Sequence, residues 1–566
     1  MRYLCFATDY DGTLASQGRV DEPTRSALER LRKSGRKLIL VSGRELQDLQ
    51  KVFPALDLFD YAVLENGALL YDPKTKEEKA IAEPPPRQFI KALRDRSVPI
   101  SVGRSIVATW HPHETTVLKV IEELGLELHV IFNKGAVMVL PTAINKASGL
   151  AAALQALNLS EHNVVGIGDA ENDHAFLSAC ECGIAVSNAL PSLKERADIV
   201  TRASHGAGVV EIIEQLIKDD LESYSVKLQR RSVLLGSDGT GGKLSLPTFG
   251  PSVLIAGPSG SGKSTVVTAV LERLCNQKYQ FLVFDPEGDY EQLLKSVTVG
   301  GVKIPPPTSE IRNLIEQHEN TVINLLGVSV DDRPAHLAGL LPVIAELRSR
   351  IGRPHWTVID EAHHLLPASW IPPENSLPEV FRSTVLVTVH PGHVSERVLG
   401  LVDTFIAVGA NADQTLTEFC RAIKVKPAHL DNHTLQAGEV LYWNIASEQP
   451  PVKLHIEPAQ TDRQRHRRKY AEGDIREKSF FFRGPQRKLN LRAQNLGMFL
   501  HLSEGIDDET WDFHLRQGDY SSWIREAIKD NELADLVAEV EKRQLSPQES
   551  RIRIREIISK KYTAAA

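Results

Sequence analysis

The stretch SVLIAGPSGSGKST occupies residues 252–265 and decides the fold class of the middle of the chain. A short run typical of a buried strand leads into a glycine-rich turn of the pattern G-x-x-x-x-G-K-[ST], and a helical pattern follows. In such a turn, backbone N–H groups and the start of the helix surround phosphate groups. The stretch therefore predicts a strand, a P-loop and a helix, which together begin an α/β nucleotide-binding domain.

The glycine-rich turn also supplies the candidate ATP-binding residues. Lys263 is expected to reach the β- and γ-phosphates, and Ser264 is expected to ligate Mg²⁺. The other candidate ATP ligands are Gly257, Gly260, Gly262 and Thr265. The predicted cofactors of this region are thus ATP and Mg²⁺.

Two further strand patterns end in groups that suit ATP hydrolysis. WTVI at residues 356–359 is followed by Asp360, a candidate Mg²⁺ ligand, and by Glu361. Glu361 is placed to polarise an attacking water, which favours hydrolysis over transfer to a bound acceptor. His390 follows the strand pattern at 385–389 and is placed to sense the γ-phosphate.

This combination resembles the HerA/FtsK-type ATPases over residues 228–457. The resemblance implies a RecA-like domain that assembles as a homo-oligomer, often a hexamer that moves DNA, with an arginine from a neighbouring subunit completing each site. The sequence departs from the group at His390, where glutamine is usual, and it shows no obvious DNA-gripping insertion. ATP hydrolysis is therefore expected more firmly than movement along nucleic acid. The candidates for the arginine in trans are Arg382, Arg397 and Arg421.

A second group of polar residues lies near the N-terminus. DYDGTL at residues 9–14 directly follows an apolar strand pattern, so both aspartates are expected at the ligand-binding edge of a parallel sheet. Asp9 and Asp11, two positions apart, can act as a pair. One carboxylate attacks a phosphorus atom, and the other donates a proton to the leaving oxygen and later activates water.

Such an attack needs a cation and hydrogen-bond donors, because a carboxylate and a phosphate repel each other. Ser42 follows the strand pattern at 38–41, and Lys146 begins a helical pattern. Asp169 and Asp173 follow another strand pattern and add carboxylates. All these residues are therefore expected at one edge of an α/β sheet.

In this order, the motifs resemble those of the haloacid dehalogenase superfamily of phosphatases over residues 1–220. The resemblance implies a Rossmannoid domain with an α/β cap inserted at about residues 70–140, and ENGA at 65–68 matches the Cof-like subgroup. It implies Asp9 as nucleophile and Asp11 as general acid and base. The implied phosphate-binding residues are Thr13, Ser42 and Lys146, and the implied Mg²⁺ ligands are Asp9, Asp11, Asp169 and Asp173.

From residue 463 to 566 the chain changes to a basic run followed by a mainly helical pattern, to which the resemblances assign no chemistry. FFFRGP at 480–485 interleaves aromatic and basic residues, which suits either contact with single-stranded nucleic acid or a small hydrophobic core. Acidic residues alternate with the aromatics further on, and they favour the core.

Composition sets outer bounds on these interpretations. The 566 residues suffice for three or four domains, and 42% hydrophobic with 25% charged residues is usual for a globular protein. No apolar stretch is long enough to span a membrane. Five scattered cysteines predict reduced thiols in a cytoplasmic protein, and Cys180-Glu181-Cys182 is interpreted as packing. The formal net charge of −7 argues against a protein that coats nucleic acid, so contact with DNA or RNA would be local.

Three hypotheses for the whole chain follow. The first is a bifunctional enzyme, a phosphatase for a small-molecule or nucleotide phosphate fused to an oligomeric ATPase, in nucleic-acid processing or defence. The second is a polynucleotide kinase-phosphatase, which Glu361 disfavours because a kinase should not activate water. The third is a phosphate-sensing N-terminal domain that regulates the ATPase.

Overall fold

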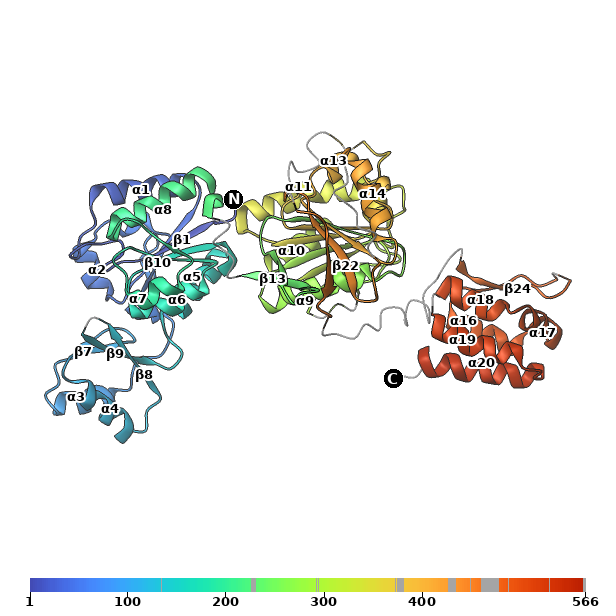
Figure 1. The fold of residues 1–566 in the computed structure, drawn as a ribbon. Coiled ribbons are helices and arrows are strands. Elements are labelled where there is room, and N and C mark those ends of the chain that lie inside the picture. Colours follow the sequence, from blue (N-terminus) through green and yellow to red (C-terminus); the bar gives the residue numbers. More distant parts are fainter. Residues whose placement is uncertain are drawn as a thin grey trace.

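The computed structural model describes residues 1–133, 135–224, 231–291, 293, 295–371, 373, 381–425, 434–447, 449–459, 478–486, 488–528 and 530–562. Figure 1 shows an N-terminal α/β domain with a cap, a central α/β domain beside it, and a helical C-terminal domain lying apart from both. The α/β class with a mainly helical C-terminal domain is thereby confirmed. None of the described helices combines the length and apolar character that crossing a membrane requires.

The N-terminal domain is built on a sheet of eight strands in the order β12-β11-β10-β1-β2-β3-β4-β5. The six strands from β12 to β3 run parallel, and β4 and β5 add an antiparallel edge. The strands are β1 Cys5–Asp9, β2 Lys37–Val41, β3 Tyr61–Leu64, β4 Leu69–Asp72, β5 Glu77–Ala80, β10 Val164–Gly168, β11 Cys182–Ala185 and β12 Ile199–Val200.

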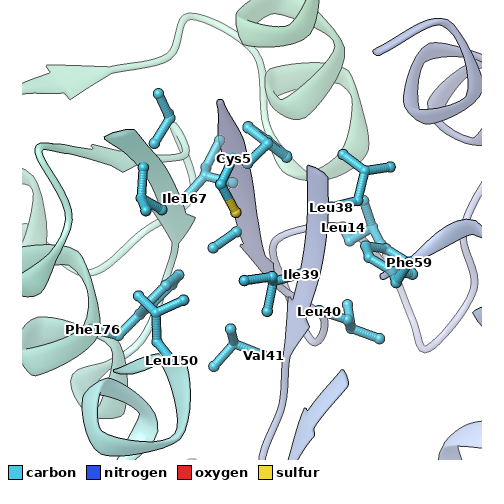
Figure 2. Close-up of a cluster of buried hydrophobic side chains, with 14 of the residues drawn as sticks. Cys5, Leu14, Leu38, Ile39, Leu40, Val41, Phe59, Leu150, Ile167 and Phe176 are labelled. Atoms are coloured by element: carbon cyan, nitrogen blue, oxygen red, sulfur yellow. The ribbon is translucent and has the colours of Figure 1, made fainter. Parts of the chain in front are cut away.

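Both faces of this sheet are covered, which explains why its central strands are apolar at nearly every position. In Figure 2, Ile39 and Val41 lie toward Leu150, whereas Leu38 and Leu40 lie on the other side of β2. The covering helices are α1 Glu22–Lys33, α2 Leu46–Val52, α5 Lys146–Leu157, α6 His174–Ala179, α7 Pro191–Arg196 and α8 His205–Asp219. The sheet is therefore a rigid frame whose polar strand ends carry the site.

The cap is a separate four-stranded antiparallel sheet in the order β6-β7-β9-β8, with its own small core. Its elements are α3 Arg87–Asp95, β6 Ser101–Val102, β7 Val107–Trp110, α4 Glu114–Glu123, β8 Leu128–Asn133 and β9 Ala136–Pro141. The cap was expected to begin near residue 70, but β4 pairs with β3 and β5 pairs with β4, so both strands belong to the main sheet.

The central domain is built on eleven strands in the order β14-β13-β23-β22-β21-β15-β20-β19-β16-β18-β17. The seven strands from β21 to β17 are parallel, and the other four form an antiparallel extension. The strands are β13 Ser232–Asp238, β14 Lys243–Pro247, β15 Ser252–Ala256, β16 Phe281–Asp285, β17 Val297–Gly300, β18 Thr321–Asn324, β19 Trp356–Ile359, β20 Thr384–Thr388, β21 Thr404–Val408, β22 Glu439–Asn444 and β23 Val452–Ile456.

Two hydrophobic clusters pack against this sheet and share its strands by alternation of side chains. Leu254 belongs to one cluster and Val253 to the other. The helices are α9 Lys263–Asn276, α10 Thr308–Glu316, α11 Arg333–Ile351, α12 Ala362–Leu365, α13 Glu396–Leu399 and α14 Ala412–Ala422. The P-loop strand β15 lies between β20 and β21, and β19 lies on the far side of β20.

The C-terminal domain packs helices around an aromatic core. Phe480 and Phe482 of β24 (Phe480–Phe482) are buried, and Phe482 stacks on Phe499 with ring centroids 5.4 Å apart. The structure therefore favours the interpretation that these aromatic residues form a small hydrophobic core. The remaining elements are β25 Leu491–Ala493, α16 Leu496–Gly505, α17 Asp508–Gln517, α18 Asp519–Trp523, α19 Asn531–Lys542 and α20 Pro547–Tyr562. The basic run at 463–469 lies outside the described residues.

Candidate functional site

The first candidate site lies where β1 and β10 end, in the N-terminal domain. Asp9 is the last residue of β1, and Asp169 and Asp173 follow β10. Because β1 and β10 are parallel neighbours, their carboxyl ends bring these groups together. Lys146, at the start of α5, places its ammonium 2.6 Å from a carboxylate oxygen of Asp9 and 2.6 Å from one of Asp173.

Three buried carboxylates here suit a divalent cation. One carboxylate oxygen from each of Asp9, Asp169 and Asp173 lies within 4.8 Å of the others. Burial, followed by the neighbouring carboxylates, raises the pKa of Asp9 to about 8 even though Lys146 opposes the shift. Mg²⁺ prefers hard oxygen ligands such as carboxylates. Here the carboxylates also outnumber the positive charges beside them. The residues therefore fit the metal site expected from the sequence.

Further hydrogen bonds fix the orientation of these carboxylates. The Thr13 hydroxyl donates to a carboxylate oxygen of Asp169 over 3.1 Å. The second oxygen of Asp173 accepts backbone N–H bonds from Asp169 and Ala170, each 2.9 Å long. Asp173 thus holds both Lys146 and the turn that carries Asp169, while Thr13 positions a candidate metal ligand.

Asp11 is held by an arginine. The Arg44 guanidinium donates two hydrogen bonds to the Asp11 carboxylate, of 2.7 and 2.8 Å, and also contacts Asp48. These hydrogen bonds, led by the one to Asp11, raise the pKa of Arg44 above its usual range. Arg44 therefore forms an ion pair with Asp11 at this edge of the sheet. The three-carboxylate group leaves out the Asp11 side chain, whose role at the metal stays a prediction.

Ser42 lies directly after β2 and is buried, and its contact with a phosphate stays a prediction. Its hydroxyl accepts the backbone N–H of Arg44 at 3.2 Å, and its carbonyl accepts the N–H of Asn66 at 3.1 Å. Asn66 in turn accepts a hydrogen bond from the side chain of Asn172. The turn after β2 is thereby tied to the turn after β10.

Glu65 is a positioning residue. From the sequence it was noted only as part of the motif ENGA at residues 65–68. Its carboxylate accepts the N–H groups of Arg104 and Ser105, each at 2.8 Å, and so joins the main domain to the cap. Gly67 has a φ of +106°, and a Cβ there would lie 1.9 Å from the carbonyl oxygen of Asn145. The motif therefore sets the start of α5 and thus the position of Lys146.

A pocket of about 480 Å³ opens between these groups and the cap. Its floor includes Asp9, Asp11 and Lys146. Its roof comes from the cap and carries neutral side chains: Ser101, Ile106, Ala108, Trp110, Ala136 and Met138. The Trp110 side chain is half exposed and so offers an aromatic surface to this space.

The second candidate site is the P-loop of the central domain. Gly257, Gly260 and Gly262 all have positive φ, and a Cβ on Gly257 would lie 2.1 Å from the carbonyl oxygen of Val408. The loop therefore requires glycine for both its backbone conformation and its packing. Lys263 is buried, and its ammonium donates to the carbonyls of Gly257 and Pro258 over 2.8 and 2.9 Å.

Ser264 and Thr265 follow in the first turn of α9, with Ser264 half-buried and Thr265 exposed. Asp360 follows β19 and is buried, with its carboxylate accepting the N–H of Glu361 at 3.0 Å. His390 follows β20 in sequence and is exposed. These elements are arranged as predicted, although the roles of the individual residues stay predictions.

His363 is a neighbour of the candidate catalytic glutamate that the sequence analysis did not single out. Its Nδ1 lies 3.4 Å from a carboxylate oxygen of Glu361 and 3.2 Å from the hydroxyl of Thr388 at the end of β20. Burial, with the nearby His364 adding to it, lowers the pKa of His363 to about 4, so the ring is neutral at neutral pH. The only sequence signal is its place two residues after Glu361.

Comparison with known proteins assigns the two α/β domains separately. Residues 6–123 and 122–213 match the family model described as haloacid dehalogenase-like hydrolase, and residues 236–352 match the model of the central domain of helicase HerA. "Phosphoglycolate phosphatase 2" of Saccharolobus solfataricus is 32% identical over 220 residues, which cover 38% of this chain and 92% of that protein.

Two further matches cover the same region. "Phosphoglycolate phosphatase" of Methanothermobacter thermautotrophicus is 27% identical, over 37% of this chain and 97% of that protein. The crystal structure of a haloacid dehalogenase-like hydrolase from Bacteroides thetaiotaomicron is 20% identical, with a TM-score of 0.34, and covers 38% of this chain and 99% of that one. The matched region is the part that holds Asp9, Lys146 and Asp169.

Proposed function

The chain belongs to the haloacid dehalogenase-like hydrolases through its N-terminal domain, and from this premise we propose an Mg²⁺-dependent phosphatase in which Asp9 is the nucleophile. The N-terminal domain is a phosphomonoester hydrolase and the central domain is an ATP hydrolase. The observation that carries the proposed mechanism is the gathering of Asp9, Asp169, Asp173 and Lys146 at one sheet edge.

In the first step, a carboxylate oxygen of Asp9 attacks phosphorus, the phosphorus–oxygen ester bond breaks, and Asp11 gives a proton to the leaving oxygen. In the second step, water attacks the aspartyl phosphate, Asp11 takes its proton, and phosphate leaves. Lys146 donates to the phosphoryl oxygens, with Ser42 and Thr13 expected to help hold the group. The carboxylates, including Asp9 and Asp169, would hold a Mg²⁺ ion, whose positive charge would offset the repulsion between carboxylate and phosphate.

The roof of the pocket favours a neutral leaving group. The two cations of the pocket, Arg44 and Lys146, are both paired with carboxylates, and the side chains from the cap are uncharged. A substrate carboxylate, as in phosphoglycolate, would find no unpaired cation among the described residues lining this pocket. Trp110 offers a stacking surface instead, which fits a nucleotide or another phosphomonoester with a planar group.

The test of substrate class compares kcat/KM for phosphoglycolate, adenosine 5′-monophosphate and p-nitrophenyl phosphate. We expect both aromatic substrates to exceed phosphoglycolate, and Trp110→Ala to lower their kcat/KM about tenfold, a typical loss of one stacking contact. Phe132→Ala is the matched control, since Phe132 is an exposed aromatic residue of the cap outside the pocket. A preference for phosphoglycolate that Trp110→Ala leaves unchanged would contradict the proposed class.

For the central domain, we propose that Lys263 binds the β- and γ-phosphates of ATP, Ser264 and Asp360 hold Mg²⁺, and Glu361 polarises the attacking water. The other P-loop residues, Gly257, Gly260, Gly262 and Thr265, would line the phosphates, and His390 would sense the γ-phosphate. We also propose assembly into a homo-oligomer, with exposed Arg382, Arg397 or Arg421 acting on a neighbouring subunit's ATP. A monomeric mass in the presence of ATP and Mg²⁺ would contradict assembly.

We propose that the chain acts in the cytoplasm and that its two activities serve nucleic-acid processing or defence. No disulfide joins the five cysteines, four of which are buried, and this fits a reducing compartment. Binding to a labelled DNA or RNA strand, with and without ATP, tests the nucleic-acid part. If the strand migrates equally with and without the protein under both conditions, the proposed role in nucleic-acid processing is wrong.

Two alternatives are separated by simple assays. With γ-labelled ATP and 5′-hydroxyl DNA, we expect label only in free phosphate, whereas label on the DNA would indicate a polynucleotide kinase-phosphatase. With a panel of phosphomonoesters and Mg²⁺, we expect turnover by the N-terminal domain. No turnover across the panel would favour a phosphate sensor that regulates the ATPase.

A further inference from the structure

The N-terminal and central domains contact each other through residues that precede the strands of both sheets. His162 precedes β10 and Tyr279 precedes β16, and their rings stack with centroids 3.6 Å apart. The Nε2–H of His162 donates to the carbonyl of Gln277 over 2.8 Å. Since the catalytic groups lie at the opposite, carboxyl ends of the strands, this contact, here called the domain seam, is separate from both sites.

One buried carboxylate organises the seam, and its charge is already compensated there. The hydroxyl of Tyr279 donates its one proton toward both carboxylate oxygens of Glu181, at 2.8 and 3.0 Å, and Glu181 also contacts Arg2 and His162. Although burial raises the pKa of Glu181, the hydrogen bond from His162 and the charge of Arg2 lead the effects that hold this pKa well below its usual range. Arg231, whose guanidinium lies 3.7 Å from the Glu181 carboxylate, adds to this compensation within the seam.

A pocket of about 260 Å³ adjoins the seam and is lined by both domains. Its charged side chains, apart from the seam, are Arg348 and Arg382 of the central domain. Glu181 is the single carboxylate among the described residues that line it. The pocket therefore presents an excess of positive charge.

Arg348 is partly buried and donates hydrogen bonds to neutral acceptors. Its guanidinium donates to the carbonyl of Pro354 at 2.9 Å, to the hydroxyl of Thr357 at 2.8 Å and to the carbonyl of Arg382 at 3.2 Å. Burial lowers the pKa of Arg348 to about 10. A cation in these surroundings is stabilised by an anion placed beside it.

His355 adds a donor that lacks an acceptor. Its Nδ1 accepts the backbone N–H of Gln280 at 2.8 Å, so the proton of the neutral ring lies on Nε2. Burial lowers the pKa of His355 well below its usual range, which keeps the ring neutral. Within the described part of the chain, its buried Nε2 has no hydrogen-bond partner. A buried donor left in this state costs free energy that an acceptor on a ligand would recover.

The rest of the lining is largely apolar and includes Phe249, Leu341, Ile344 and Phe381. We propose that this pocket binds a small anion with an aromatic body, whose anionic group is recognised by Arg348, Arg382 and His355. The apolar side chains then cover the aromatic body, as in many small-molecule sites where a few polar groups fix the orientation. The ligand would contact both domains at once.

A fluorescence titration with 8-anilinonaphthalene-1-sulfonate tests this proposal, since this probe is a sulfonate with aromatic rings and no phosphoester. The full chain is titrated with saturating ADP and Mg²⁺, so that the nucleotide site is filled. We expect saturable binding of one probe per chain. Arg382→Glu, which reverses an exposed charge of the pocket, and Ser349→Trp, which places an indole in it, should each weaken binding at least tenfold.

Lys303→Glu is the control, because Lys303 is an exposed cation of the central domain outside the pocket. Thermal unfolding of every variant shows whether the fold is retained, and the two pocket variants perturb the pocket in different ways. Weaker binding in Arg382→Glu and Ser349→Trp, with wild-type binding in Lys303→Glu, supports the proposal. Absent binding to the wild type, or equal affinity in all four proteins, overturns it.

Discussion

In the N-terminal domain Lys146 lies between two carboxylates, whereas Lys263 of the central domain donates to carbonyl oxygens of its own loop. Both lysines are buried at the start of a helix, and both sites use the carboxyl ends of parallel strands. The difference lies in charge. The N-terminal site has three carboxylates around one ammonium, while the P-loop offers glycine N–H groups and an ammonium.

This contrast indicates what each site needs before it can act. Burial, followed by the neighbouring carboxylates, raises the pKa of Asp9, and three carboxylates lie near one ammonium, so we expect the N-terminal site to require a divalent cation. The P-loop instead needs a polyphosphate, for which Lys263 would exchange its carbonyl contacts. Variants that alter one charge at a time should therefore affect one activity and leave the other.

The largest expected effect comes from removing the key charge of each site. Asp9→Asn should lower phosphatase activity on p-nitrophenyl phosphate at least ~10³-fold, because the amide cannot form the covalent intermediate. Lys263→Ala should abolish ATP hydrolysis. Each variant is the control for the other, since Asp9→Asn should keep ATP hydrolysis and Lys263→Ala should keep phosphatase activity. Loss of both activities in either variant would show that the sites are obligately coupled.

The next effect separates binding from chemistry in the central domain. Glu361→Gln should slow ATP hydrolysis ~10²-fold while ATP still binds, because the amide cannot polarise water as a carboxylate does. Phosphate release and binding of a fluorescent ATP analogue measure the two properties. Glu396→Gln, an exposed glutamate of the same domain, should behave as wild type. Normal turnover in Glu361→Gln would exclude Glu361 as the group that activates water.

The residues gathered at each strand end were predictable from sequence, because parallel strands place their carboxyl ends at one edge. Asp9 meets Lys146 and Asp169 for this reason, although both lie more than 130 positions after Asp9 in the chain. The P-loop was predictable from local pattern alone, since its glycines have the positive φ that the turn requires. Topology and local conformation thus accounted for the main parts of both sites.

Features that depend on side-chain reach or on domain packing were not predictable. The pairing of Arg44 with Asp11 depends on the direction of two side chains 33 positions apart. The residues of β4 and β5 were expected in the cap, and only the pairing of β4 with β3 and of β5 with β4 assigns them to the main sheet. Glu181, interpreted as packing, contacts Tyr279 of another domain.

A smaller effect tests whether the position of Lys146 depends on the turn that packs against it. Gly67→Ala should destabilise the N-terminal domain by about 3 kcal/mol, through the clash with Asn145 and the strained φ. Gly35→Ala is the matched control, because Gly35 has a φ of +92° but nothing within 4 Å of its Cβ position, so strain alone remains. Its expected cost is about 1 kcal/mol. Chemical denaturation measures both values, and equal costs would remove the role of close packing.

The smallest expected effect is stabilisation by Mg²⁺ without nucleotide. A cation that binds only the folded N-terminal site adds ~1.4 kcal/mol at ten times its dissociation constant, which raises the unfolding temperature of that domain by about 3 °C. Asp169→Asn removes one of the three carboxylates and should abolish most of this shift. The central domain should respond to Mg²⁺ only when ATP or ADP is present, because its loop lacks a comparable group of three carboxylates among the described residues. An equal shift in wild type and Asp169→Asn would place the stabilising ion elsewhere and would weaken the contrast between the two lysines.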